Sequence, residues 1–102
     1  MKSHMITGGA GVRLHLLETG NARGQSIVFI HGLSQCSLAW TRQMVSDLAD
    51  TYRLVAMDMR GHGLSEKPRE GYADSRLWAE DVRAVIETLD LDTTVLCDMI
   101  LQ

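Results

Sequence analysis

Hydrophobic and polar positions change their spacing several times along the chain, and each change predicts a different element. Residues 12–16 alternate apolar and polar side chains, as a strand with one buried face does. The glycine-rich stretch Gly8–Gly11 before them suits a tight turn, so an N-terminal hairpin is expected. Three later runs are mainly apolar, at Ile27–Ile30, Leu54–Met57 and Thr93–Cys97. Runs of this kind are typical of strands covered on both faces, and such strands are usually parallel.

Two stretches between these strands have the spacing of helices with one buried face. The first stripe consists of Trp40, Met44, Val45 and Leu48, and the second of Trp78, Val82, Val85, Ile86 and Leu89. Ser37 is expected to cap the first helix, and Asp74 or Ser75 the second. The resulting order, a hairpin followed by β-α-β-α-β, predicts a single α/β domain over residues 1–102 with a mainly parallel sheet.

Composition places the chain with ordinary globular sequences, at 102 residues with 45% hydrophobic and 23% charged residues. This length is small for an α/β enzyme with several parallel strands. No apolar run approaches the roughly 20 residues that cross a bilayer, and the N-terminus lacks a signal-peptide pattern, so a cytoplasmic protein with no membrane partner is expected. Met1–Met5 (MKSHM) includes a second methionine; these residues could derive from cloning, and the fold prediction leaves them out.

Charge and cysteine content argue against several function classes. Ten Lys and Arg against thirteen Asp and Glu give a net charge of −3 with no basic block, so no nucleic-acid partner is expected. Cys36 and Cys97 form no CxxC pair and the histidines are not clustered at ligand spacing, so neither a metal nor a disulfide is predicted. Gly9–Gly11 lacks the third glycine of a dinucleotide-binding motif, and no phosphate-binding loop occurs, so no cofactor is expected.

Candidate chemistry lies beyond the carboxyl ends of the strands, where open α/β sheets bind ligands, in the loops that begin at His31, Asp58 and Asp98. The first loop begins with His-Gly and carries Trp40 nine residues after His31. The second reads Asp-x-Arg-Gly-His-Gly-x-Ser. Together these motifs resemble the N-terminal portion of the α/β-hydrolase family, of the esterase, lactonase and haloperoxidase kind, over about residues 5–97. The resemblance implies a partial α/β-hydrolase fold, in a domain that is incomplete.

In that family, the residue after His-Gly offers its backbone N–H to the oxyanion that forms when a nucleophile attacks an acyl carbon. The resemblance therefore assigns this donor to Leu33, in an oxyanion loop with His31 and Gly32. A donor held by the sheet is already aimed when charge develops, and it typically contributes about 3 kcal/mol. The alternative is that His31 and Gly32 only end the strand.

The second loop is expected to have a structural role, and its motif residues are Asp58, Arg60, Gly61, His62, Gly63 and Ser65. Its carboxylate can accept loop N–H bonds, its guanidinium can pair with acids or carbonyls, and its glycines supply backbone angles that other residues avoid. His31 and His62 precede the position of the family's catalytic histidine, and they are expected to bond neighbouring backbone. Trp40 is expected in the core, with the substrate pocket as the alternative, and Cys36 as an inert thiol.

The family's catalytic residues have no counterpart in this sequence. Relatives carry Gly-x-Ser-x-Gly after the strand that matches Thr93–Cys97, whereas this chain continues with Asp98–Gln102. No serine follows Ser75 and no histidine follows His62. Asp98 is not favoured as a nucleophile, because it follows the strand directly and no later histidine could activate water against an ester. No nucleophile is therefore assigned.

The resemblance implies a hydrolase of ester, lactone or related small-molecule acyl substrates in the complete protein. The chain itself is interpreted as a fragment that ends before the nucleophile, and it is expected to be inactive. The alternative is a non-catalytic binding or self-associating module on a hydrolase scaffold. In the family's sheet order the strand Thr93–Cys97 lies at an edge, and together with the apolar tail 99–101 it invites pairing with a second chain.

Overall fold

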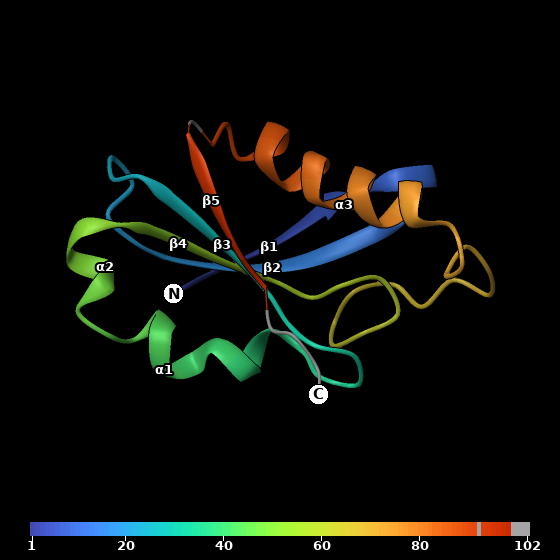
Figure 1. Cartoon of the computed structure of the whole chain (residues 1–102), viewed down its shortest axis with the longest axis horizontal. Helices are drawn as coiled ribbons and strands as arrows, with labels where there is room; N and C mark the ends of the chain where they lie inside the picture. The colour runs from blue at the N-terminus through green and yellow to red at the C-terminus, as the bar shows by residue number, and fades with distance from the viewer. Residues whose placement is uncertain (92, 99–102) are drawn as a thin grey trace.

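The computed structural model describes residues 1–91 and 93–98, which form a five-stranded sheet with helices on both faces (Figure 1). The strands are β1 (Lys2–Thr7), β2 (Arg13–Gly20), β3 (Ser26–Ile30), β4 (Arg53–Met57) and β5 (Thr94–Asp98). The helical segments are the short turns η1 (Gly9–Gly11) and η2 (Ser37–Trp40) and the helices α1 (Thr41–Met44), α2 (Leu48–Thr51) and α3 (Ser75–Thr88). Each predicted strand is present.

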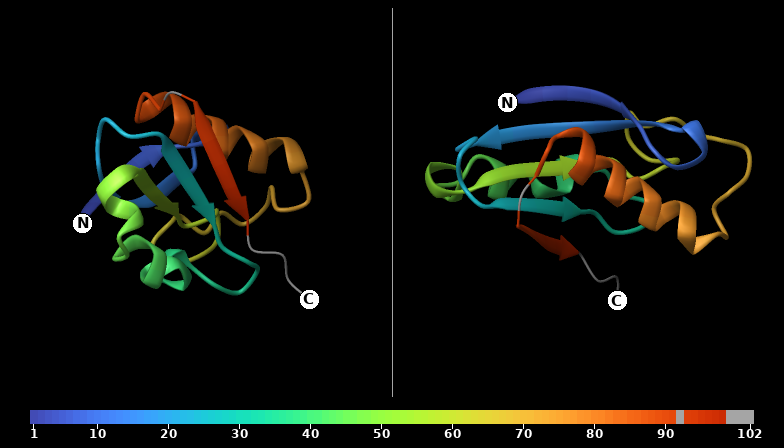
Figure 2. Two further views of the ribbon diagram at one scale, coloured as in Figure 1. Left: turned by 60° about the vertical axis from the view of Figure 1, so that its left-hand side comes forward. Right: turned by 90° about the horizontal axis from the view of Figure 1, so that it is seen from above.

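The sheet has the strand order β1-β2-β4-β3-β5 (Figure 2). β1 and β2 form the predicted antiparallel hairpin around η1, and β2 also pairs antiparallel with β4. β1 includes residues 2–5, so leaving them out of the fold prediction is wrong. β3 pairs in parallel with both β4 and β5. The prediction of a mainly parallel sheet thus holds for the three strands joined by helical crossovers. The hairpin makes the whole sheet mixed, because two strands joined by a tight turn run antiparallel.

The two helical crossovers run in opposite directions across the sheet, so the point of reversal lies between the neighbouring strands β3 and β4. The first crossover leads from β3 to the neighbouring β4, whereas the second leads from β4 past β3 to β5. Right-handed crossovers in opposite directions place their helices on opposite faces. Accordingly, α3 lies on one face and α1 and α2 lie on the other (Figure 1, Figure 2). In sheets of this kind, ligands bind beyond the carboxyl ends of the strands at the point of reversal.

Each face of the sheet has its own hydrophobic core, because successive side chains of a strand point to opposite faces. On the α3 side the buried residues are Ile6, Val12, Leu14, Leu16, Val28, Val55, Met57, Val85 and Leu91. On the other side they are Phe29, Trp40, Met44, Leu54 and Ala56. Burying a side chain of this size contributes about 1.5–3 kcal/mol. The two cores therefore hold a helical layer on each face.

The first predicted helix is wrong as a continuous element, because η2, α1 and α2 replace it. The breaks fall at Trp40 and Val45, whose φ angles of −101° and −104° leave the helical range. The Ser46 hydroxyl donates to the Gln43 carbonyl, a local bond that competes with helix hydrogen bonds. Val45, predicted on the buried stripe, is 68% exposed.

The prediction that Ser37 caps this segment is also wrong. Cys36 occupies the cap position, with no side-chain capping bond. The backbone N–H of Ser37 donates instead to the Asp58 carboxylate, 2.6 Å away in the chain segment after β4. A long-range carboxylate thus replaces the local cap that the sequence suggested.

The second predicted helix is confirmed as α3. Asp74 is its N-cap, and the Asp74 carboxylate accepts the Arg76 N–H at 3.0 Å. Val85 lies fully buried in the core of that face. Across residues 1–91 and 93–98, no helix combines the length and the apolar character that crossing a membrane requires.

β5 lies at the edge of the sheet, as predicted, and runs one residue later than expected, from Thr94 to Asp98. Asp98, expected to follow the strand, is therefore its last residue and pairs with Ile30. Val95 and Leu96 point to opposite faces and are 46% and 52% exposed. The prediction that this run is covered on both faces is therefore wrong for β5, because the described helices leave both of its faces half-exposed. The apolar tail 99–101 lies outside the described residues.

Candidate functional site

Two loops lie beyond the carboxyl ends of neighbouring parallel strands. The loop predicted to stabilise an oxyanion, called the oxyanion loop (residues 31–35), follows β3, and the motif loop (residues 58–65) follows β4. Ile30 lies opposite Met57 in the sheet register, so both loops leave the sheet at the same level. The sheet therefore places side by side the two motifs that the sequence separates by more than twenty residues.

His31 links the two loops through both of its ring nitrogens. Its Nε2 accepts the Met59 N–H at 2.9 Å, so Nδ1 carries the ring hydrogen and donates to the Gly32 carbonyl at 2.7 Å. Burial lowers the pKa of His31 below its ordinary value; the bond to Gly32 opposes this, and the neighbouring His62 ring lowers it further. The fold thus stabilises a neutral His31 that holds backbone, as expected of a loop-positioning residue.

Leu33 lies at the exposed tip of the oxyanion loop. The Gln35 N–H donates to the Gly32 carbonyl at 3.2 Å, and Gln35 Oε1 accepts the Gly32 N–H at 3.1 Å, which closes a tight turn. Ser34 in this turn has a φ of +65°, a left-handed conformation that costs energy for a residue other than glycine. No described residue accepts the backbone N–H of Leu33. The predicted oxyanion donor therefore has no internal acceptor within residues 1–91 and 93–98.

Asp58 connects the motif loop to neighbouring segments. Its carboxylate accepts the N–H groups of Ser37 and Leu64 at 2.6 and 3.1 Å, and it lies 2.8 Å from the His15 ring. The Ser65 hydroxyl donates to the Asp58 carbonyl at 2.6 Å. Burial alone would raise the pKa of Asp58, but the hydrogen bonds from Ser37, His15 and Leu64 outweigh it and lower that pKa. Asp58 is thus an ionised acceptor that shapes the loop.

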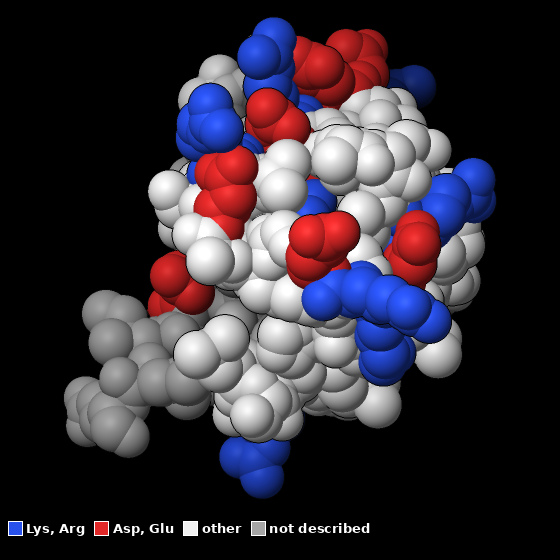
Figure 3. Space-filling model, turned by 90° about the vertical axis from the view of Figure 1, so that its right-hand side faces the viewer, with Lys and Arg blue, Asp and Glu red and all other residues white. Residues whose placement is uncertain are grey.

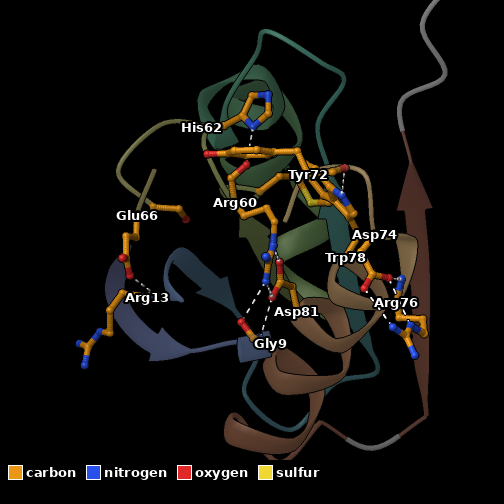
Figure 4. Close-up of polar contacts among 12 residues, drawn as sticks. Gly9, Arg13, Arg60, His62, Glu66, Tyr72, Asp74, Arg76, Trp78 and Asp81 are labelled. Carbon is orange, nitrogen blue, oxygen red and sulfur yellow. Dashed lines mark hydrogen bonds and ion pairs between the residues drawn. The ribbon is translucent and has the colours of Figure 1, made fainter. Parts of the chain in front are cut away.

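Arg60 is buried and binds Asp81 of α3 through two hydrogen bonds (Figure 4). Nε donates to one carboxylate oxygen at 2.6 Å and Nη2 to the other at 2.8 Å. The same Nη2 reaches the Gly9 carbonyl at 3.0 Å. The Asp81 carboxylate raises the pKa of Arg60 even though burial opposes this. The pair joins the motif loop to α3 and η1.

Asp81 was not among the residues predicted from the sequence. A signal was available, because Asp81 lies three residues after Trp78, on the buried stripe of α3, where an unpaired carboxylate would be costly. The partner could not be inferred, since the sequence offers several Lys and Arg side chains.

The motif-loop glycines have the backbone angles that the sequence predicts. Gly61 has a φ of +79°, and a Cβ there would lie 2.6 Å from the Tyr72 ring. Gly63 has a φ of +52°, and a Cβ there would lie 2.4 Å from the Asp58 carboxylate. His62 places Nδ1 2.9 Å from the carbonyl two residues before it, the expected contact with neighbouring backbone.

Trp40 belongs to the core. It is 7% exposed and stacks on Phe29 with ring centroids 4.7 Å apart. Its buried Nε1 has no hydrogen-bond partner among the described residues, so packing alone places the ring. Cys36 is half-buried and is not disulfide-bonded.

A largely apolar pocket of about 490 Å³ lies beside the motif loop, and its walls are Ser3, His15, Leu17, Cys36, Ser37, Leu38, Asp58, Gly63 and Leu64. This volume is in the range of small-molecule sites. Strand alternation places His15 on the face of β2 opposite the buried Leu14 and Leu16. His15 is nevertheless only 5% exposed. Residues of η2 and the motif loop cover that face of β2.

Charged side chains of both signs are interspersed on the side of the molecule that Figure 3 shows. No continuous basic area is present on this side, as a surface that follows phosphates would require. Within the described residues, no group of three or more His, Cys, Asp or Glu side chains could hold a metal ion.

Comparisons with known proteins agree with the geometry. A family described as alpha/beta hydrolase fold matches residues 25–97. The chain is 40% identical over 86 residues to epoxide hydrolase 1 of Caenorhabditis elegans, covering 82% of this chain and 21% of that protein. It is 37% identical over 86 residues to a non-heme chloroperoxidase of Streptomyces lividans, covering 84% of this chain and 31% of that protein.

A solved structure is equally similar. An esterase from a Rhodococcus species superimposes with a TM-score of 0.88 at 39% identity, covering 94% of this chain and 35% of that one. The chain thus spans only 21% and 31% of the two curated relatives.

Proposed function

This chain belongs to the α/β-hydrolase fold family, and we propose that it forms the oxyanion-stabilising side of a site that hydrolyses esters, lactones or related acyl substrates. Leu33 provides the backbone donor, and Gly32 lets the substrate approach the main chain. His31 is the positioning residue. The relatives include an esterase and an epoxide hydrolase, which supports a hydrolytic reaction.

The observation that carries this proposal is the position of residues 31–35 relative to the sheet. These residues follow β3, whose crossover runs in the opposite direction to that of its neighbour β4. α/β sheets bind their ligands beyond the strand ends at such a point of reversal. His31 donates to the Gly32 carbonyl within the oxyanion loop and accepts the Met59 N–H of the motif loop, which holds the two loops together. A donor fixed before the reaction costs no reorganisation when the oxyanion forms.

The chain alone is expected to show no turnover at this site. No serine follows Ser75 and no histidine follows His62, so the family's nucleophile and base have no counterpart within these 102 residues. With p-nitrophenyl acetate, the chain and its Leu33→Pro variant should have equal steady-state rates. A higher rate for the chain would contradict this expectation.

A chimera tests the donor directly. Residues 25–97 would replace the matching segment of the Rhodococcus esterase, whose remaining part supplies the catalytic groups. We expect the chimera to hydrolyse p-nitrophenyl acetate, and Leu33→Pro in it to lower kcat by about 10²–10³-fold with little change in KM, because the lost N–H acts only on the oxyanion.

Leu33→Ala in the same chimera is the matched control. It keeps the backbone N–H and should keep kcat, since the Leu33 side chain is 65% exposed. Equal kcat values in the Leu33→Pro and Leu33→Ala chimeras would contradict the oxyanion role of the Leu33 N–H.

A second candidate function is self-association through β5, with a second copy of the chain as the partner. β5 is an edge strand, and Val95 and Leu96 are half-exposed on its two faces. Uncovered apolar edge strands readily pair with another chain. This proposal concerns the sheet edge at β5 and not the loop that contains Leu33, so it is compatible with the oxyanion role.

A further inference from the structure

Ser3, His15 and Asp58 form one hydrogen-bonded line outside the oxyanion loop. Ser3 Oγ lies 2.6 Å from His15 Nε2, and His15 Nδ1 lies 2.8 Å from Asp58 Oδ2. The three residues come from β1, β2 and the start of the motif loop. We propose that they form a second, acyl-accepting site, in which Ser3 is the nucleophile, His15 the base and Asp58 the positioning residue.

The hydrogen-bond pattern assigns the ring hydrogen of His15. Asp58 is surrounded by N–H donors and acts as an ionised acceptor, so the group that faces it from His15 is a donor, Nδ1–H. In the neutral ring, Nε2 is then the free nitrogen and can accept from the Ser3 hydroxyl 2.6 Å away. This tautomer is the one that a base needs in order to take the serine proton.

The surroundings separate the roles of the three residues. His15 and Asp58 are 5% and 1% exposed, so the base and its positioning residue are held in place by the fold. Ser3 is exposed on the edge strand β1, where a reagent can reach Oγ. The nucleophile is thus accessible and within hydrogen-bond reach of a base that a third group orients, the signature of nucleophilic catalysis.

The pocket indicates the class of substrate. Ser3, His15 and Asp58 are among its walls, and much of the remaining wall is apolar, from Leu17, Leu38 and Leu64. Its volume of about 490 Å³ suits a small ester with an apolar alkyl or aryl group.

The reaction at this site balances without a further reactant. Ser3 Oγ attacks the acyl carbon of an aryl ester, His15 Nε2 takes the hydroxyl proton, and the bond to the aryl oxygen breaks, releasing the phenolate. The product is an acyl ester of Ser3. With an alkyl fluorophosphonate, the same attack forms an oxygen–phosphorus bond and releases fluoride.

An alkyl fluorophosphonate tests the site in the intact chain. We expect one equivalent to add to the folded chain, with peptide mapping by mass spectrometry placing it on Ser3. Ser3→Ala should abolish the addition, whereas Ser75→Ala, which removes another exposed serine, should keep it. His15→Asn should slow labelling by about 100-fold or more, because it removes the base.

One further measurement keeps the proposal falsifiable if His15→Asn does not fold. Labelling of Ser3 should be lost when the wild-type chain is unfolded in urea. Absence of labelling in the folded chain, labelling at another residue, or equal labelling in urea would each overturn the proposal. None of these results bears on the Leu33 chimera.

Discussion

His31 makes two hydrogen bonds that require an uncharged ring. Protonation of Nε2 would remove the acceptor of the Met59 N–H. Because burial lowers the pKa of His31, the unfolded chain takes up this proton at higher pH than the folded chain. The resulting stability is complete above the ordinary histidine pKa of about 6.5 and declines as the pH falls below it, by at most about 1.4 kcal/mol per pH unit.

Urea unfolding followed by tryptophan fluorescence, from about pH 8 down to about pH 5, measures this effect. The free energy of unfolding of the wild-type chain should fall over the acidic half of the range, and His31→Gln should flatten that fall. His4→Gln, which removes a half-buried imidazole on β1, is the control and should leave the fall in the free energy of unfolding unchanged. Equal pH dependence in wild type and His31→Gln would contradict the assignment.

The buried pair of Arg60 and Asp81 provides a stability prediction. Asp81→Asn leaves a buried guanidinium without its carboxylate, so it should destabilise the fold by about 3–5 kcal/mol or prevent folding. Glu87→Gln on the same helix removes one partner of an exposed ion pair and should change stability little. Urea unfolding compares the two variants, and similar midpoints would argue against the structural role of Asp81.

Individual residues were predictable where their role depends on near neighbours. The glycine conformations at 61 and 63 and the bond of His31 to the Gly32 carbonyl follow from short loops after buried strands. Asp81 and His15 were not predictable, because each acts on a residue more than twenty positions away.

At the scale of elements, the structure of α3 depends on nearby residues, whereas that of the segment after the oxyanion loop also depends on a distant one. α3 has a capping carboxylate, one buried stripe and no interruption, so sequence periodicity and structure agree. The stripe that contains Trp40 and Val45 has similar spacing, but it does not form one helix. The Ser46 hydroxyl donates to the Gln43 carbonyl, and the Ser37 N–H donates to the Asp58 carboxylate.

A matched pair of substitutions measures this difference. Val85→Ala on α3 removes two fully buried methyl groups and should cost about 2 kcal/mol. Val45→Ala makes the same chemical change at a position that is 68% exposed and should cost little. If the two variants lost similar stability in urea unfolding, Val45 would belong to a buried helical stripe after all.

At the scale of the whole molecule, the sheet order places β3, the strand that leads into the oxyanion loop, between β4 and β5. The same order leaves β5 at an edge. The feature that supports a ligand site is thus also the one that leaves an apolar strand uncovered.

Sedimentation velocity tests the proposed pairing of β5. The wild-type chain should form species larger than a monomer as its concentration rises, and Leu96→Lys should shift it toward monomer, because a charged edge strand resists pairing. Leu64→Lys, at an exposed leucine of the motif loop, is the control and should not. A monodisperse wild-type monomer with one cooperative thermal transition would contradict self-association.

The sequence by itself determined the strands, the long helix, the hairpin and the two loop motifs, because these depend on spacing within about a dozen residues. Tertiary structure decided the division of the first helix, the mixed character of the sheet and the pairing of Arg60 with Asp81. It also placed Ser3 against His15 and Asp58. Such contacts depend on which strands become neighbours, and only the packing of both helical layers on the sheet determines that.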